Sequence, residues 1–230
     1  MRNSHAQYPV ESARALLNTV SSPFFAALAC IAVIVAALGP AAAQGLYGEG
    51  VPDDAAFIRF AHAAPELGPV QAEIDGLPFE TVETTAVTPY LTLAEGPRQI
   101  HAGDLEASVD AAAGSFYTVA IFAEELVVVE DEVLDDPALA LLALCNFSDS
   151  EAVSLVTADG ETALADIDAG SCASVAVNAV VVDLAVTSSG EALGEPVAAQ
   201  LDRGEAYTVF ALRGSEGPEV ILTRAELVLN

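Results

Sequence analysis

Apolar and polar positions alternate in short runs along most of the chain beyond residue 55. In the run AFIRFAHA at 56–63, Phe57, Arg59 and Ala61 fall on one face of an extended strand, and the residues between them fall on the other. Such runs are rich in Val, Ile, Phe and Tyr and are separated by turn sequences such as Asp75-Gly76. This pattern predicts β-strands joined by tight turns. Further runs of this kind lie at 70–75, 116–123 and 125–133.

Helical periodicity is nearly absent beyond the N-terminal region. The one stretch with helical character, VLDDPALALLAL at 133–144, is interrupted by Pro137. Proline in a helix interior removes a hydrogen bond and clashes with the preceding turn. We therefore predict an all-β chain.

Two strand-like segments are nearly the same. GSFYTVAIF at 114–122 and GEAYTVFAL at 204–212 lie 90 residues apart, and each has a glycine three residues before Tyr-Thr-Val. EIDG, which ends at Gly76, and TADG, which ends at Gly160, lie 84 residues apart, and the same offset matches His62 with Asn146. We predict an internal duplication that forms two tandem small β-sandwich domains, in which the Tyr-Thr-Val segments are core strands.

The domain limits follow from this repeat. The acidic, proline-containing stretch at 135–138 is typical of a short linker. We expect a first sandwich at 55–134 and a second at 139–230, preceded by an N-terminal segment at 44–54.

The first 43 residues are typical of an export signal. An uninterrupted apolar run at 24–38 follows a weakly basic start and is ended by Gly39 and Pro40, after which Ala41 and Ala43 form an A-x-A cleavage pattern. The run is shorter than the roughly 20 residues of a comfortable membrane span. We expect a cleaved signal peptide at 1–43 and a periplasmic protein; an uncleaved anchor is the alternative.

The charge of the chain limits the ligands it can bind, and its cysteines allow one disulfide. The chain has 34 Asp and Glu against 7 Lys and Arg, a net charge of −27, which repels nucleic acids and other polyanions. Cys145 and Cys172 are the two cysteines that remain after loss of the signal. An oxidising compartment allows them to form a disulfide, and two buried free thiols are the alternative.

Candidate chemistry is sparse. Beyond the signal only His62 and His101 could act as histidine bases, and no G-x-S-x-G element is present. The segment DIDAG at 166–170 resembles a calcium loop, but Val177 occupies the position where an EF-hand needs a bidentate Glu. A calcium site in a loop of another type stays open. We expect no enzyme activity, no cofactor and no catalytic residue.

Three segments resemble the AlgF-type alginate biosynthesis proteins. They are GLYGEGVPDDAAFIRFAHA at 45–63, with a Leu-Tyr-Gly motif before a strand of the form F-[VI]-R, LCNFSDSEAVSLVTADGETAL at 144–164, and PVAAQLDRGEAYTVFAL at 196–212. The resemblance covers residues 46–230 and implies a periplasmic accessory protein of polysaccharide O-acetylation. The partners it implies are a membrane-bound O-acyltransferase and SGNH-type O-acetyltransferase proteins, which carry the Ser-His-Asp chemistry.

Other interpretations stay open. HAAP at 62–65 followed by EIDG also resembles a bacterial surface β-domain, which would make the chain a cell-surface module. A third interpretation is direct binding of an acidic polysaccharide, although the negative charge opposes it. As partner contacts we expect Tyr47, near the new N-terminus, together with His62 and Pro65, which bracket a turn that the second domain lacks.

Overall fold

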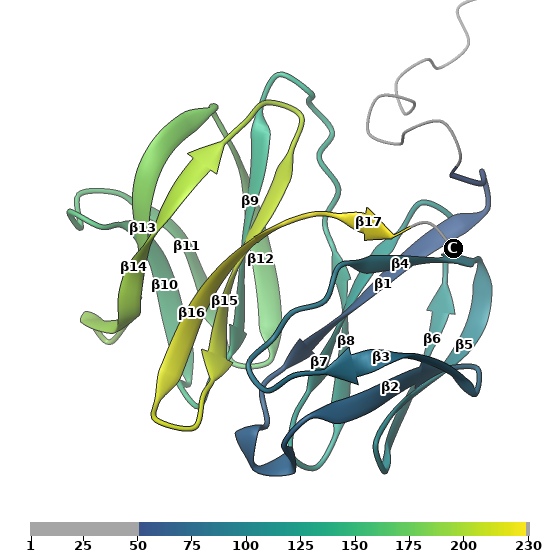
Figure 1. Ribbon diagram of the computed structural model, residues 1–230. Helices are drawn as coiled ribbons and strands as arrows, with labels where there is room; N and C mark the ends of the chain where they lie inside the picture. Colours follow the sequence, from purple (N-terminus) through teal and green to yellow (C-terminus); the bar gives the residue numbers. More distant parts are fainter. Residues whose placement is uncertain (1–50, 229–230) are drawn as a thin grey trace, which may run out of the picture. The chain divides into compact units, whose positions relative to one another are not determined.

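The computed structural model describes residues 51–228, which form 17 β-strands and one 3-10 turn, η1 (Pro65–Leu67) (Figure 1). No α-helix occurs among these residues, and the prediction of an all-β chain is confirmed. None of the described residues belongs to a helix with the length and hydropathy of a membrane span. The expected signal peptide at 1–43 and the expected contact Tyr47 lie outside the described residues.

The first sandwich contains two sheets that face each other (Figure 1). Its inner core is built from residues that alternate along the strands, such as Ile58, Phe60, Ile100 and Val119. One sheet has the order β4-β1-β7-β8, from β1 (Ala55–His62), β4 (Tyr90–Ala94), β7 (Phe116–Ile121) and β8 (Leu126–Asp131). The other has the order β3-β2-β5-β6, from β2 (Val70–Ile74), β3 (Leu77–Val82), β5 (Gly96–Ala102) and β6 (Leu105–Ala111).

The second sandwich repeats this topology strand for strand. One sheet has the order β12-β9-β15-β16, from β9 (Ala140–Phe147), β12 (Ser171–Val177), β15 (Ala206–Arg213) and β16 (Pro218–Arg224). The other has the order β11-β10-β13-β14, from β10 (Ala152–Thr157), β11 (Ala163–Asp168), β13 (Val180–Ser188) and β14 (Glu191–Leu201). Each label exceeds its counterpart in the first sandwich by eight, and this identity of order confirms the duplication.

The two tyrosines of the repeated segment form the same hydrogen bond in both sandwiches. Each lies at the start of a central strand, and its hydroxyl oxygen accepts a backbone N–H from five residues upstream. The donor to Tyr117 Oη is Ala112 and the donor to Tyr207 Oη is Asp202, both at 3.1 Å. This is the tyrosine-corner arrangement of β-sandwiches. The repetition of Tyr-Thr-Val therefore reflects the scaffold.

The glycine before each tyrosine is required by the backbone. Gly114 and Gly204 both have φ of 77°, a left-handed conformation that side-chain-bearing residues adopt at a cost. Their N–H groups donate to the carbonyls of Ala55 and Leu139, each at 2.7 Å. In this way the turn before the central strand is tied to the start of the first strand in both copies.

The end of the chain departs from the expected domain layout. Strand β17 (Leu227–Val228) lies in the range assigned to the second sandwich, yet it pairs in parallel with β4 of the first. The N–H of Tyr90 donates to the carbonyl of Glu226 at 2.8 Å, and Thr92 Oγ1 donates to the carbonyl of Val228 at 3.1 Å. The exposed edge of β4 explains the departure, because its unpaired backbone groups can bind a further strand.

Candidate interaction site

The outer faces of the β1 sheet and the β9 sheet bury each other. The alternation in β1 was predicted correctly, but the face that carries Phe57, Arg59 and Ala61 is as buried as the inner face. One apolar cluster draws residues from both sandwiches, so the two domains share a continuous packed interface. Its buried members are Ala61, Ala63, Ala120, Cys145, Phe147, Phe210 and Leu212.

Arg59 lies at this interface with only 2% of its surface exposed. Its Nε donates to Thr118 Oγ1 at 2.8 Å, within the first sandwich, and its Nη2 donates to Thr208 Oγ1 at 3.0 Å, within the second. Nη2 also lies 3.7 Å from Asp131 Oδ1. Thr118 and Thr208 are the threonines of the two Tyr-Thr-Val segments, so a single guanidinium joins the two copies of the repeat.

Two aromatic rings and one carboxylate complete this arrangement. The guanidinium carbon of Arg59 lies 4.5 Å from the ring centroid of Tyr90 and 4.8 Å from that of Phe210, which is cation–π geometry. Asp131 Oδ2 accepts from Tyr90 Oη at 2.8 Å and from Thr118 Oγ1 at 2.6 Å. Burial raises the pKa of the Tyr90 phenol above its ordinary value, which keeps the hydroxyl protonated as a donor. We call these residues the Arg59 cluster: Arg59, Tyr90, Thr118, Asp131, Thr208 and Phe210.

Cys145 and Cys172 form a disulfide between directly opposed positions of β9 and β12. Cys145 is fully buried in the interface cluster, and both sulfurs lie within 4.8 Å of a carboxylate oxygen of Asp131. In residues 51–228 this is the one grouping of His, Cys, Asp or Glu that has the spacing of a metal site. Because the two sulfurs are bonded to each other, they are not available as thiolate ligands.

His62 does not lie on the surface, contrary to its expected role as a partner contact. Its side chain is completely buried. Nδ1 accepts the N–H of Ala64 at 3.2 Å, so Nε2 carries the proton and donates to the carbonyl of Gly68 at 2.9 Å. Both ring nitrogens thus hold the connection between β1 and β2, and neither can reach a partner.

Asn146, at the matching position of the second sandwich, has the equivalent role. Its Oδ1 accepts the N–H of Ser148 at 3.3 Å, and its Nδ2 donates to the carbonyl of Ser150 at 2.9 Å. A neutral imidazole and a carboxamide each present an acceptor atom and a donor atom to the backbone at the end of the strand. The pairing of His62 with Asn146 in the repeat is therefore a shared structural role.

This equivalence leads to a pH prediction. Burial lowers the pKa of His62 in the folded chain below its ordinary value of 6.5. At a pH between the lowered pKa and 6.5, the unfolded chain therefore binds a proton at His62 and the folded chain does not. The His62 contribution to stability is present above pH 6.5 and is lost as the pH falls below it. We expect His62→Asn to fold and to show a flatter fall in unfolding free energy between about pH 7.5 and 5.5 in urea titrations. An unchanged pH slope in this variant would assign the acid sensitivity to other groups.

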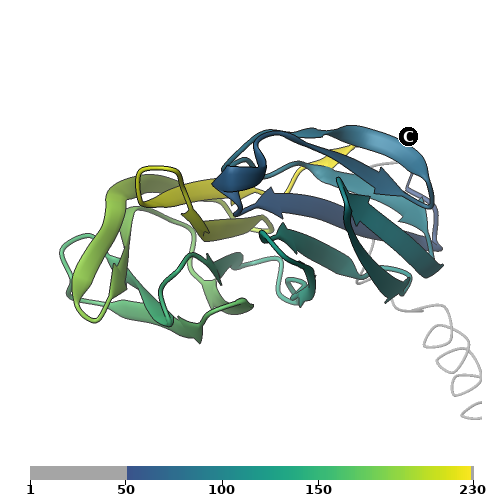
Figure 2. The same ribbon diagram turned by 90° about the horizontal axis from the view of Figure 1, so that it is seen from below.

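The turn that His62 supports presents an exposed leucine. In η1 the N–H of Leu67 donates to the carbonyl of Ala64 at 3.0 Å, while 41% of the Leu67 surface stays exposed and Pro65 is half-buried. Seen from below, η1 is a short turn where the chain leaves β1 (Figure 2). The second sandwich has no 3-10 turn between β9 and β10. Pro65 thus belongs to a surface feature that, within residues 51–228, occurs only in the first domain.

Two hollows border this turn. The first, of about 390 Å³, is lined by the apolar residues Leu67, Pro69, Val70, Leu105 and Ala123 together with the polar residues Gln71 and Asp104. The second, of about 410 Å³, adjoins it through Ala123 and is mixed in character. It is lined by Glu66, Phe122, Glu124, Phe147, Asp149 and Arg213. We call η1 with these two hollows the Leu67 surface.

The charge of the Leu67 surface is almost entirely negative. Its one cation, Arg213, is already engaged, with Nη1 3.2 Å from a Glu66 oxygen and Nε 3.2 Å from an Asp149 oxygen. Asp104, Glu124 and Glu125 are exposed and, within the described part of the chain, form no ion pair. The surface therefore combines one largely apolar hollow, one mixed hollow and uncompensated carboxylates.

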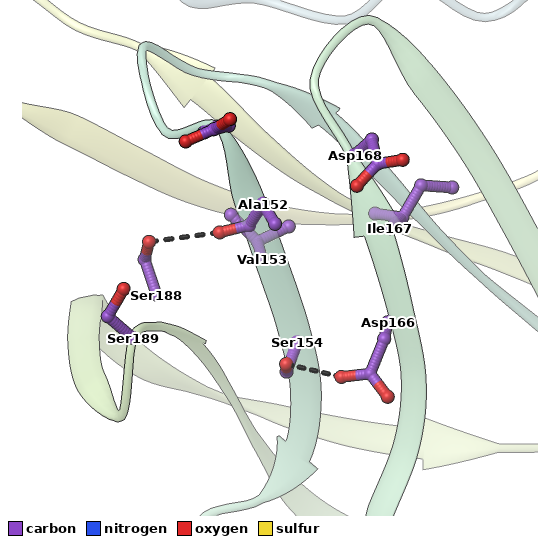
Figure 3. Close-up of a pocket in the computed structure, with 9 residues that line it drawn as sticks. Ala152, Val153, Ser154, Asp166, Ile167, Asp168, Ser188 and Ser189 are labelled. Atoms are coloured by element: carbon purple, nitrogen blue, oxygen red, sulfur yellow. Dashed lines mark hydrogen bonds between the residues drawn. The ribbon is translucent and has the colours of Figure 1, made fainter.

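A third hollow lies on the second sandwich, across β10, β11 and the β13–β14 turn (Figure 3). It contains the carboxylates of Glu151, Asp166 and Asp168 together with serine hydroxyls, and no aromatic side chain lines it. Ser154 donates to Asp166, and Ser188 donates to the carbonyl of Ala152 at 2.9 Å. A uronate chain placed here would meet like charge and no ring on which to stack.

The fold and these surfaces define a duplicated β-sandwich protein whose two domains share one buried interface. The family model described as "Alginate O-acetyl transferase AlgF" matches residues 27–208, which is most of the chain. The chain belongs to this family, and its general role lies in alginate O-acetylation. The resemblance read from the sequence is thereby confirmed.

The solved structures that are similar to this chain include the following two. One is the C-terminal domain of AlgF from P. aeruginosa, with 25% identity and a TM-score of 0.35, covering 38% of this chain and 98% of that domain. The other is the Bacillus anthracis TIE protein, with 10% identity and a TM-score of 0.26, covering 69% of this chain and 34% of that one. No curated protein matches the sequence.

Sequence reasoning missed Arg59 as the central residue of the interface. Two signals could have identified it: a charged side chain inside an otherwise apolar strand, and its place in the Phe57-Ile58-Arg59 segment of the family resemblance. A buried arginine needs acceptors and carboxylates around it. Those partners lie too far along the chain for a local pattern to show them.

Proposed function

We propose that this protein is a non-catalytic accessory factor of exopolysaccharide O-acetylation that works in the periplasm. In this proposal it binds an SGNH-type O-acetyltransferase protein and acts together with a membrane-bound O-acyltransferase. Membership in the AlgF family is the observation that carries the proposal. The polymer is alginate or a similar exopolysaccharide.

The state of the histidines supports a role without chemistry. Acyl transfer by a serine or cysteine needs a base hydrogen-bonded to the nucleophile. His62 uses both ring nitrogens on backbone groups, and in the described residues neither His62 nor His101 is hydrogen-bonded to a Ser, Thr or Cys side chain. In this proposal the partner supplies the nucleophile.

Charge favours a protein partner over the polymer. A chain with a net charge of −27 repels a uronate polyanion. Its exposed hollows carry carboxylates, and the arginines at 98, 213 and 224 are paired with acidic side chains. Arg203 is exposed and forms no ion pair with the described residues, but it lines none of these hollows. Direct binding of the polymer would need free cations or stacking aromatics at the surface, and neither lines these hollows.

The experiment is affinity purification of the protein from the periplasm of the native host, combined with deletion of its gene. We expect the SGNH-type protein to co-purify, and we expect deletion to lower the acetyl content of the polymer without removing the polymer. Acetyl transfer by the purified protein alone, or tight binding to a uronate polymer without a partner, would overturn the proposal.

A further inference from the structure

We propose that the Leu67 surface is the docking site for a partner protein segment that carries an apolar anchor flanked by basic residues. This inference rests on the proposed function as an adaptor and adds where the partner binds and what chemistry it presents. Four connections meet at this surface, from β1–β2, β5–β6, β7–β8 and β9–β10. The turn η1 contributes Leu67 to one hollow and Glu66 to the other.

The turn is held in place before any partner arrives. His62 bonds to Ala64 N–H and to the Gly68 carbonyl, and the Gly68 N–H donates to the carbonyl of Pro65 at 3.2 Å. An exposed leucine on a backbone restrained in this way loses little conformational entropy on binding. Leu67 and the hollow beside it can therefore receive an apolar side chain at low cost.

Charge complementarity sets the nature of the segment. Asp104 borders the first hollow, Glu124 and Glu125 border the second, and the only cation present is paired with Glu66 and Asp149. Lys or Arg residues on the partner would find free carboxylates on both sides of the anchor. An acidic segment would be repelled, so a second copy of this acidic chain is a poor occupant.

Matched variants of the full exported protein test the site. Leu67→Asp removes the apolar contact at a position that is already 41% exposed, so the fold should tolerate it. Leu77→Asp is the control, because Leu77 is a 72% exposed leucine at the start of β3 in the same sandwich. Glu124→Lys reverses a carboxylate of the surface, and Glu161→Lys reverses an exposed one outside it.

The first measurement is binding of each variant to the purified SGNH-type protein at low and high salt. We expect Leu67→Asp and Glu124→Lys to weaken binding about tenfold or more, and both controls to leave it unchanged. Binding by the wild-type protein should weaken as the salt concentration rises, and binding by Glu124→Lys should depend less steeply on salt. Normal binding by Leu67→Asp would overturn the docking site while leaving the proposed function intact.

The second measurement does not depend on the identity of the partner. A photo-crosslinking residue is placed at position 67 or at position 77 in the full protein, and the cross-linked peptides are sequenced from the periplasm. A peptide with basic residues around an apolar anchor, captured from 67 and not from 77, supports the inference even if the SGNH-type protein fails to bind. No cross-link from 67, an acidic peptide, or a second copy of this chain would overturn it.

Discussion

Replacement of Arg59 by leucine is expected to lower the free energy of unfolding by about 3–5 kcal/mol, the range for breaking a buried ion pair. The change removes the Arg59 bonds to Thr118 and Thr208 and leaves the Asp131 carboxylate beside the disulfide without its cation. It also removes the cation–π contacts that join Tyr90 to Phe210. Urea unfolding followed by circular dichroism measures the loss.

Because Arg59 bonds to both sandwiches, its loss should also weaken the coupling between them. We expect one unfolding transition in the wild-type protein and two separated transitions in Arg59→Leu. Arg224→Leu is the matched control, since Arg224 pairs with Glu205 through a half-exposed side chain at the surface. Such pairs contribute about 0–1 kcal/mol. A loss in Arg59→Leu no larger than in Arg224→Leu would contradict a central role for the Arg59 cluster.

A double variant separates the two causes of this loss. If the isolated Asp131 carboxylate is the main cost, then Asp131→Val should restore part of the stability when added to Arg59→Leu, because a buried pair replaced by apolar groups is often nearly neutral. If lost packing is the main cost, the double variant should be less stable than either single one. The double-mutant cycle gives the coupling energy between the two residues.

Removal of the disulfide is the second large effect. The variant with both Cys145→Ala and Cys172→Ala is expected to lose about 3–4 kcal/mol of stability, because the bond closes a loop between cysteines that are 27 positions apart. Reduction of the wild-type protein by dithiothreitol should lower its urea midpoint to that of the variant. The same reductant should leave the variant unchanged.

Titration of free thiols distinguishes the disulfide from two unpaired cysteines. The sequence left open a pair of buried free thiols, and that state predicts two thiols in the denatured protein purified without reductant. Insensitivity of the wild-type midpoint to reductant, together with two titratable thiols, would contradict the disulfide.

The two strands of the Tyr-Thr-Val repeat show which features of the fold could be predicted from short-range sequence pattern. Period-2 alternation and turn glycines were enough to predict the strands, the duplication and the core position of Tyr117 and Tyr207. The tyrosine-corner bonds span five residues, so they too belong to local structure. The disulfide partners could be named because the chain leaves only two candidates after the signal.

His62 and Pro65 show what short-range sequence pattern could not predict, namely which side chains reach the surface. Both were expected at a partner contact, yet their roles diverge: His62 is buried beneath the turn, and Pro65 starts the turn that exposes Leu67. Leu67 itself was not singled out, because a lone leucine in a polar stretch carries no pattern. Its hollows form only when three connections of the first sandwich meet the β9–β10 connection of the second.

The all-β class, the duplication and the residues that share each face of a strand could be predicted from local pattern, since these depend on interactions between near neighbours in the chain. What covers each face became visible only in the folded protein. The face of β1 that carries Arg59 meets Thr118, Thr208 and Thr223, which lie 59, 149 and 164 residues away. Alternation identifies the residues on a face, whereas the occupant of that face depends on long-range packing, and this packing placed a charged side chain between two sandwiches.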